Sequence, residues 1–225
     1  MRTRVGILVG LAAEARLIER AAAGTLHATV VRTGADGARA REGAERLARS
    51  GVAALLSFGL AGGLDPALRP GDLIVAEGVA LPDGRVIAAD PRWRSVLHGA
   101  APHALGGTVA GSDRALSDAA DKARLHAATG ARAVDMESHA LALSAERHGL
   151  PFVVIRAVAD PAEHGLPAIA RVPLRADGTV RLSATLPALL ARPGEWPRVA
   201  RLAGETRAAL ASLSRAVRPA LLAPL

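Results

Sequence analysis

The sequence predicts a single-domain, three-layer α/β fold whose central sheet is mixed and largely buried. Short apolar runs alternate along the chain with longer stretches in which apolar residues recur at the 3.6-residue helical period. This alternation is typical of domains in which helices cover a central sheet. A chain of 225 residues is long enough to bury one substantial core, so we assign residues 1–225 to one domain.

The expected strands are the short apolar runs, many of which end at a glycine or a charged residue. They cover residues 4–10, 26–32, 52–59, 72–78, 84–88, 105–111, 132–135 and 152–158. The expected helices are the longer periodic segments, at 12–22, 37–49, 91–99, 118–129, 137–148, 183–191 and 197–217.

The sequence also predicts several helix ends and one long loop. Asp90 before Pro91 is typical of an N-cap followed by proline at the first helical position. Gly130 and Gly149 stand where helix C-termini favour glycine. The stretch 159–182 has no clear period, and long loops in compact domains are more often functional than idle, so we expect a lid there.

Composition limits the classes of function. Lys and Arg total 28 against 21 Asp and Glu, a net charge of +7, so the surface should attract anions. Nucleic acid is disfavoured as a partner because the basic residues are spread along the chain and aromatic residues, which stack on bases, make up only 2%. With no cysteine, the chain has no disulfide framework and no cysteine nucleophile.

The N-terminal segment MRTRVGILVGLAAEARLIER begins with basic residues and an apolar run, as signal peptides do. The run reaches Glu14 after about ten residues and a helical pattern follows, so a first strand and helix are expected instead. No apolar stretch approaches the roughly 20 residues that cross a bilayer. We therefore expect a cytoplasmic protein, with peripheral contact to the inner face of the membrane left open.

Three chemistry-bearing segments stand at predicted strand ends. In the first, GLAGG at 59–63, Gly62 and Gly63 should let the backbone turn tightly and approach a ligand. In the second, AVDMESHALA, the carboxylates of Asp135 and Glu137 flank Met136, and in the third a buried strand runs out to Asp160. Ligands of open α/β sheets gather outside the carboxyl ends of the strands, so these segments predict one site.

The segments GLAGGLDPALRPGDLIVAEGV, AVDMESHA and LPFVVIRAVADPA resemble motifs of the purine nucleoside phosphorylase and methylthioadenosine/adenosylhomocysteine nucleosidase superfamily. Further segments are similar to the hopanoid-associated phosphorylases: VGLAAEARLI, DPRWRSVL, GSDRALSDAADKARLHAATGA and LLARPGEWPRVARLA. That branch is thought to remove adenine from adenosylhopane. The resemblance thus implies an enzyme that cleaves a purine N-glycosidic bond, releasing adenine and giving ribosylhopane or its 1-phosphate.

The resemblance also implies roles for the carboxylates. Glu137 would accept hydrogen bonds from the ribose hydroxyls, Met136 would pack on the sugar, and Asp135 would support the turn. Asp160 would donate a proton to N7 of the departing purine. Such a general acid needs a raised pKa, whereas Glu137 should stay ionised beside a ribosyl cation-like transition state.

The nucleophile is either water or phosphate. The nucleosidase branch uses a Glu in the first strand-to-helix loop to activate water, and Glu14 is the carboxylate available there. Phosphorolysis instead needs a cationic cradle for phosphate as co-substrate, for which Arg16 and Arg32 are the candidates. The strand position that often bears Arg in purine phosphorylases is Ser57 here, and the usual serine of their Gly-Ser loop is Leu60. Both differences weaken a phosphate site, so hydrolysis is favoured and phosphorolysis stays open.

The remaining substrate contacts are assigned by position. The glycine-rich segment, the loop at 111–116 and one aromatic residue should line the base and sugar: Gly59, Leu60, Ala61, Gly62, Ala115, Leu116 and Phe152, with Phe58 as the other aromatic. An apolar exit for a lipid tail is expected in the loop 161–175, through Leu166, Pro167, Ile169 and Val172. The histidines His139 and His164 are interpreted as a helix-surface residue and a loop residue.

Several alternatives accompany this interpretation. The substrate could be methylthioadenosine, adenosylhomocysteine or a general purine nucleoside, or the chain could bind a nucleoside or lipid without turnover. No metal or other cofactor is expected, because no group of His, Asp and Glu residues has the spacing of metal ligands and the chemistry needs none. The resemblance implies a homodimer or larger assembly. The helix at about 197–217 is expected to pack on the domain, with transient membrane contact as the alternative.

Overall fold

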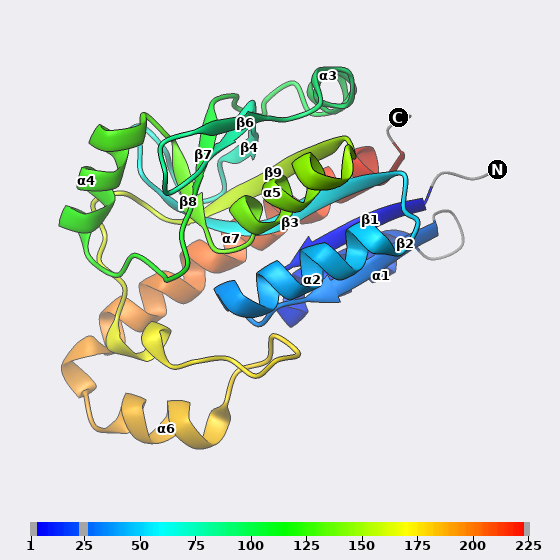
Figure 1. Ribbon diagram of the computed structural model, residues 1–225. Helices are drawn as coiled ribbons and strands as arrows, with labels where there is room; N and C mark the ends of the chain where they lie inside the picture. The colour runs from blue at the N-terminus through cyan, green and yellow to red at the C-terminus, as the bar shows by residue number, and fades with distance from the viewer. Residues whose placement is uncertain (1–3, 23–26, 223–225) are drawn as a thin grey trace.

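Nine strands in the described part of the chain, residues 4–22 and 27–222, form a single mixed sheet in the computed structural model (Figure 1). They are β1 (Arg4–Val9), β2 (His27–Arg32), β3 (Ala54–Gly63), β4 (Leu73–Val75), β5 (Gly78–Ala80), β6 (Val86–Ala88), β7 (Thr108–Gly111), β8 (Ala133–Asp135) and β9 (Phe152–Asp160). The order is β2, β1, β3, β8, β7, β5, β6, while β9 pairs with β3 and β4. Strands β3 and β9 run parallel, and β3 and β8 antiparallel, which confirms the mixed sheet.

Helices cover both faces of this sheet (Figure 1). The helices are α1 (Ala12–Ala22), α2 (Gly37–Arg49), α3 (Pro91–Ala100), α4 (Ala119–Thr129), α5 (Ser138–His148), α6 (Leu182–Leu190) and α7 (Trp196–Leu222), with short 3-10 turns η1 (Ala168–Arg171) and η2 (Pro193–Glu195). Side chains of α1, α3 and α7 share one apolar core, and those of α2 and α5 share another. Ile7 and Val9 point into the first core and Leu8 into the second, as strand alternation requires. The predicted three-layer arrangement is confirmed.

Most expected elements lie where the sequence pattern placed them, with three differences. The segment predicted as one strand at 72–78 is two strands, β4 and β5, with different partners. Strand β3 continues through Gly62 and Gly63, so the tight turn predicted there is wrong and these glycines serve close packing inside the sheet. The final helix is longer than 197–217, and its buried Leu213 packs it on the sheet.

The predicted caps have the expected geometry. The Asp90 carboxylate accepts a hydrogen bond from the Trp93 backbone N–H at 2.8 Å, with Pro91 in the first helical turn. Gly130 and Gly149 end α4 and α5 with φ of 65° and 61°, a left-handed conformation that glycine adopts without strain.

The long segment after β9 leaves the body of the domain and forms a separate lobe. It contains η1 and α6 and returns through η2 into α7 (Figure 1, yellow to orange). No residue of α6 is buried. Within the described ranges, no helix is both long and apolar enough to cross a membrane.

Candidate active site

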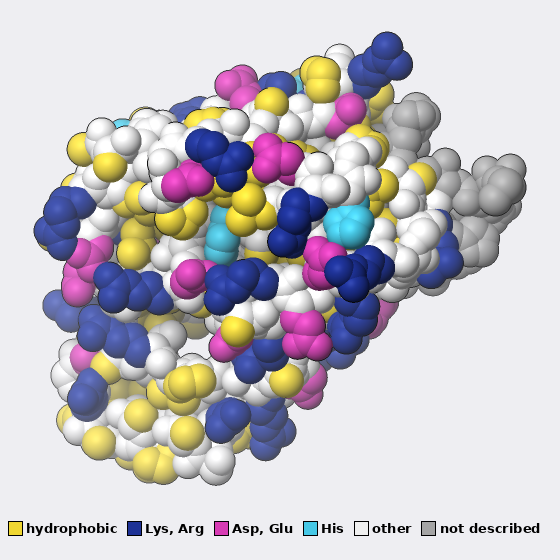
Figure 2. Space-filling view, viewed as in Figure 1, with side chains coloured by type: hydrophobic (Ala, Val, Ile, Leu, Met, Phe, Trp, Pro, Cys, Tyr) yellow, Lys and Arg dark blue, Asp and Glu magenta, His cyan; other side chains and the backbone are white. Residues whose placement is uncertain are grey.

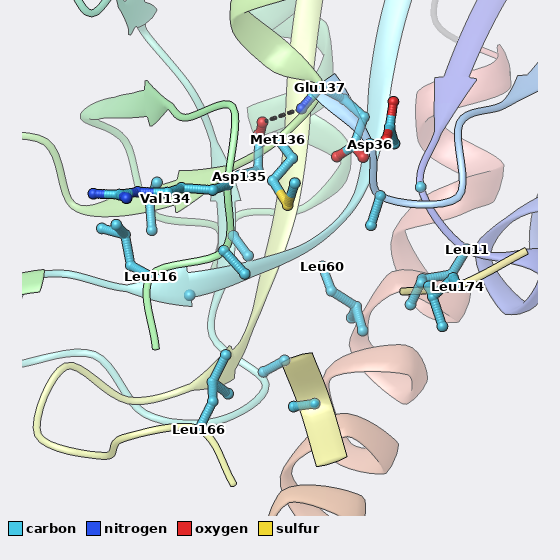
Figure 3. Close-up of a pocket in the computed structure, with 18 of the residues that line it drawn as sticks. Leu11, Asp36, Leu60, Leu116, Val134, Asp135, Met136, Glu137, Leu166 and Leu174 are labelled. Atoms are coloured by element: carbon cyan, nitrogen blue, oxygen red, sulfur yellow. Dashed lines mark hydrogen bonds between the residues drawn. The ribbon is translucent and has the colours of Figure 1, made fainter. Parts of the chain in front are cut away.

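A cavity of about 480 Å³ lies beyond the carboxyl ends of β1, β2, β3, β7 and β9 and at the β8–α5 junction. The lid segment, defined here as residues 166–174, closes its other side. In the close-up, Met136 points into the cavity from the β8–α5 junction, while Leu166 and Leu174 lie on the lid side (Figure 3). The position agrees with the prediction of one site at the strand ends.

The β8–α5 junction presents Met136 and Glu137 to the cavity because Asp135 holds the turn. One carboxylate oxygen of Asp135 accepts from the backbone N–H groups of Glu137 at 2.9 Å and Ser138 at 2.7 Å (Figure 3). Its other oxygen accepts from the Ser138 hydroxyl. Asp135 therefore accepts hydrogen bonds from otherwise unpaired N–H groups at the start of α5. Its role is to hold Met136 and Glu137 in position.

Glu137 is 4% exposed and lines the cavity. Its Oε1 accepts a hydrogen bond of 3.0 Å from the hydroxyl of Thr33, which follows β2. A Cβ added at Gly10 would lie 2.9 Å from the same oxygen, so only glycine leaves room for this carboxylate. Three segments far apart in sequence thus place one carboxyl group at the cavity wall.

Asp160 ends β9 and lines the same cavity as Glu137. Its carboxylate forms an ion pair with Lys122 of α4, whose side chain is fully buried. Lys122 also donates to the carbonyl oxygens of Pro161 at 2.8 Å and His164 at 3.1 Å. Burial raises the pKa of Asp160 to about 6, although the Lys122 charge opposes the shift. The raised pKa predicted for this residue is therefore present.

Glu14 lies in the first turn of α1 and lines the cavity. Its Oε2 accepts from the N–H groups of Gly10 at 2.9 Å and Leu11 at 2.7 Å, and its Oε1 accepts from that of Leu60 at 2.8 Å. The carboxylate therefore joins the β1–α1 loop to the end of β3. Burial nevertheless raises the pKa of Glu14, against the nearby Arg156 charge and these three N–H groups.

Arg156 is the central residue that the sequence reasoning missed. It is fully buried in β9, with Nε 2.6 Å from Oδ2 of Asp135 and Nη2 3.6 Å from Oε2 of Glu137. The Nε–H direction is not aligned for a hydrogen bond, so the contact with Asp135 is an ion pair. Nη2 also donates to the Ser57 hydroxyl at 2.5 Å. A charged residue inside the apolar run FVVIRAV was the available signal.

Three carboxyl groups surround this one guanidinium, so the cluster cannot be neutral with all of them ionised. Burial raises the pKa of Glu137 to about 7, opposed by Arg156 and reinforced by the carboxylates of Asp135 and Glu14. The expectation that Glu137 stays ionised therefore holds only in part for the free protein, because a carboxyl group with a pKa of about 7 is partly protonated near neutral pH. Desolvation and like charges both disfavour full ionisation of the cluster.

The glycine-rich segment of β3 contributes in two different ways. Leu60, Ala61 and Gly62 line the cavity. Gly59 lies behind it, where a Cβ would come 2.5 Å from Nη1 of Arg156 and 2.6 Å from Oε1 of Glu14. Its predicted role in contacting substrate is therefore replaced by one in making room for the buried charge cluster.

The two phenylalanines and the two arginines considered for the site lie elsewhere. Phe152 begins β9 at the opposite end of the sheet, where it is 3% exposed and part of the core, and Phe58 is also core. Arg16 is exposed on α1, and Arg32 pairs with Glu19 at 2.5 Å. Neither arginine lines the cavity, so the predicted phosphate cradle is wrong. Phe152 is also the first residue of the predicted strand 152–158, which is the end away from the carboxyl-end site.

The predicted base and tail contacts are largely brought together. Ala115 and Leu116 line the cavity from the loop after β7, and Leu166 and Val172 line it from the lid segment. Pro167 and Ile169 of the same loop do not. Ala115, Leu116, Leu166 and Val172 therefore give the cavity aliphatic walls on these sides.

Of the two histidines, His139 differs from the expectation and His164 agrees with it. His139 is buried, with Nε2 3.1 Å from the cavity-lining Asp113, so its assignment to a helix surface is wrong. His164 lies in the loop after β9, as predicted, with Nδ1 3.1 Å from Glu205. Neither histidine lines the cavity.

Comparison with known families decides the class of the protein. A family model described as the phosphorylase superfamily matches residues 13–186, which is most of the chain and includes Glu14, Asp135, Glu137 and Asp160. The chain belongs to the phosphorylase superfamily. This membership confirms the predicted superfamily and the prediction of an enzyme.

Solved structures have the same fold at low sequence identity. A methylthioadenosine/adenosylhomocysteine nucleosidase from Neisseria meningitidis is 18% identical with a TM-score of 0.75, over 97% of this chain and 98% of that one. The nucleosidase from Colwellia psychrerythraea, solved with adenine, is 19% identical with a TM-score of 0.72, over 98% and 95%. The futalosine hydrolase of Helicobacter pylori is 17% identical with a TM-score of 0.70, over 96% and 97%. These similarities concern the fold and confirm the predicted architecture.

Proposed function

We propose that this protein hydrolyses the N-glycosidic bond of a purine nucleoside. The observation that carries the proposal is the meeting of three buried carboxyl groups, those of Asp160, Glu137 and Glu14, at one cavity. Breaking the bond needs a proton for the departing base, a grip on the sugar, and an activated nucleophile. We assign one carboxyl group to each of these tasks, and both the family and the nucleosidases of the same fold support this chemistry.

Asp160 is the proposed general acid. A carboxyl group with a pKa of about 6 carries a proton in a useful fraction of molecules near neutral pH and still releases it readily. Proton donation to the purine ring turns an anionic leaving group into a neutral one. General acid catalysis of this kind contributes roughly 10²–10⁴-fold to the rate.

Glu137 is the proposed sugar ligand. The ribose hydroxyls would donate to its carboxylate, while Met136 packs against the ring from the adjoining position. As positive charge develops on the ribosyl ring, an ionised Glu137 is stabilised by it, so the interaction strengthens toward the transition state. Substrate hydroxyl groups therefore favour the ionised form that burial disfavours in the free protein.

Glu14 is the proposed base that activates water. It hydrogen-bonds both the β1–α1 loop and β3, so its carboxylate is fixed at the cavity wall. Phosphate is the weaker candidate for the nucleophile. The fully buried Arg156 is engaged by neighbouring carboxylates, and the cavity-lining basic residues in the described chain are Arg114 and Arg171 of outer loops. A dianion would meet Glu14 and Glu137 without a free buried cation.

Adenosylhopane is the substrate that we propose. Support comes from the resemblance to the hopanoid-associated phosphorylases in VGLAAEARLI and LLARPGEWPRVARLA. It also comes from the aliphatic lid side of the cavity, where Leu166, Val172 and Leu174 offer apolar surface to a tail at the ribose 5′ position. Ribosylhopane and adenine would be the products.

The test supplies adenosylhopane, methylthioadenosine and adenosine separately, each with and without phosphate, and identifies products by mass. We expect adenine and ribosylhopane without phosphate, with adenosylhopane as the best substrate. Strict dependence on phosphate would refute hydrolysis, and equal turnover of adenosine would refute the lipid-tailed substrate. The Asp160→Asn variant should lose activity by roughly 10²–10⁴-fold. Unchanged turnover in that variant would remove Asp160 as the acid.

A further inference from the structure

Large apolar side chains are exposed together on the lobe that carries α6. Leu182, Leu186 and Leu190 are 64%, 52% and 67% exposed, and their spacing of four residues puts them along one side of the helix. Val180 and Trp196, each 50% exposed, flank them. These five residues are called the α6 patch. Elsewhere in the described chain, the large apolar residues with comparable exposure are the separate Val86 and Val96.

The α6 patch is not explained by folding. No residue of α6 is buried, and its contacts within the described chain are mainly with the short turns η1 and η2 of the same lobe. Burying exposed leucines is the usual driving force for docking an amphipathic helix. A helix that exposes three of them in water therefore calls for a partner surface.

Arginines surround the α6 patch. In residues 168–201 there are six exposed arginines against two carboxylates, Asp177 and Glu195; the arginines are Arg171, Arg175, Arg181, Arg192, Arg198 and Arg201. Arg171 and Arg201 pair with Asp118 and Glu205, whereas the other four arginines have no ion-pair partner among the described residues. The space-filling view shows apolar and basic side chains gathered on this lobe (Figure 2). The fitting partner is therefore both apolar and negatively charged.

The same lobe forms one wall of the active-site cavity. The lid segment 166–174 lines the cavity and leads directly into the chain that carries α6. The Ala12 N–H donates to the Gly178 carbonyl oxygen at 3.1 Å, and the Leu166 N–H donates to that of Ser117 at 2.8 Å. These bonds tie the lobe to both sides of the cavity, so a surface that holds α6 also holds the lid side of the active site.

We propose that the α6 patch docks on the surface of an anionic lipid bilayer. The leucines and Trp196 would enter the interfacial region while the arginines contact phosphate headgroups. A second copy of the chain fits less well, because a symmetric contact would bring the arginines of both copies together. Docking rests on the proposed function only in its purpose, which is to bring the cavity to a nucleoside anchored in the membrane.

Vesicle sedimentation tests the proposal with the full chain. We expect binding to phosphatidylglycerol-rich vesicles at least about tenfold stronger than to phosphatidylcholine vesicles, and weakened by salt. The variant Leu182→Ser/Leu186→Ser/Leu190→Ser should lose at least about tenfold in affinity for the anionic vesicles. The matched control Val86→Ser/Val96→Ser should bind as the wild type does. A charge variant, Arg192→Gln/Arg198→Gln, should also bind more weakly, whereas Arg16→Gln/Arg46→Gln should lose less.

Several outcomes would overturn the docking proposal. The proposal is wrong if the wild-type protein does not bind anionic vesicles. It is also wrong if the triple-leucine variant of α6 binds them as strongly as the wild type does. Sedimentation velocity of the same variants checks the alternative partner, and a wild-type dimer that the leucine variant dissociates would assign the surface to a second copy. Adenine release from soluble methylthioadenosine should be unchanged in the α6 variants. Vesicle binding without any nucleosidase activity would refute the proposed function and leave docking intact.

Discussion

Lys122 and Asp160, 38 residues apart in sequence, form a buried ion pair at the edge of the cavity. The ammonium group has further acceptors in the carbonyl oxygens of Pro161 and His164, so it is fully engaged. A cation beside a general acid lowers its pKa, whereas burial raises it, and burial prevails here at about 6. The pair therefore holds Asp160 in place and also sets the pH range in which it carries a proton.

The Lys122→Met variant should shift the pH profile of kcat/KM. A general acid must be protonated, so wild-type kcat/KM should fall as pH rises through about 6, the pKa of Asp160. Without the Lys122 charge, that pKa rises, and the fall should move upward by about one pH unit or more. Initial rates of adenine release across pH 5 to 9 measure the shift. A variant that is only less stable, with an unmoved profile, would limit Lys122 to a structural role.

The Glu137→Gln variant should be more stable than the wild type at pH 8. Because the folded-state pKa of Glu137 is raised to about 7, its contribution to stability is present below about pH 4.5 and is lost as pH rises through 7. Glutamine does not titrate and can still accept from Thr33, so the variant should gain on the order of 1–3 kcal/mol at pH 8 and little at pH 5. Thermal unfolding at both pH values measures this, with exposed Glu42→Gln as the control.

Adenine release by Glu137→Gln should fall sharply even as stability rises, since the lost charge is the one that grips the sugar. Such a trade-off is common where active sites hold uncompensated charge. A Glu137→Gln variant less stable than wild type at pH 8 would show that the ionised form is well compensated in the folded protein.

The Gly59→Ala variant should displace the buried charged groups of Arg156 and Glu14 that pack against this glycine. Its Cβ would meet Nη1 of Arg156 at 2.5 Å and Oε1 of Glu14 at 2.6 Å, distances that force both groups to move. We expect a loss of about 1–3 kcal/mol in unfolding free energy and at least tenfold in kcat. Gly204→Ala is the control, because open space surrounds that position in α7 and alanine favours a helix. Equal behaviour of the two variants in chemical denaturation would contradict the packing argument.

The Leu213→Ala variant should be far less stable than a leucine truncation on α6. Leu213 of α7 is fully buried against the sheet, so truncation should cost about 2–5 kcal/mol. Leu190→Ala on α6, where the side chain is 67% exposed, should stay within about 0.5 kcal/mol. Urea unfolding of both variants gives the comparison. A costly Leu190→Ala would mean that the α6 patch is part of the core.

The local pattern of the sequence was sufficient for most of the architecture. Helices α1 and α2 have the ranges that periodicity predicts, 12–22 and 37–49, because an amphipathic helix is encoded by neighbours on one face. The division of residues 72–80 into two strands was not predictable, since β4 and β5 pair with different strands in one apolar stretch. Strand pairing depends on partners distant in sequence, and a local window does not contain them.

The candidate site divides in the same way. The sequence by itself determined that Glu137 and Asp160 stand at predicted strand ends, and the resemblance to the nucleosidases singled out Glu14 in the first strand-to-helix loop, before any geometry was known. Only the tertiary structure decided which charges face them. Arg156 meets its partners because the parallel register of β3 and β9 sets it opposite Gly59, and Lys122 reaches Asp160 from a helix without any distinctive pattern. Coulombic pairing depends on distance in space, which hydrophobic periodicity along the chain does not specify.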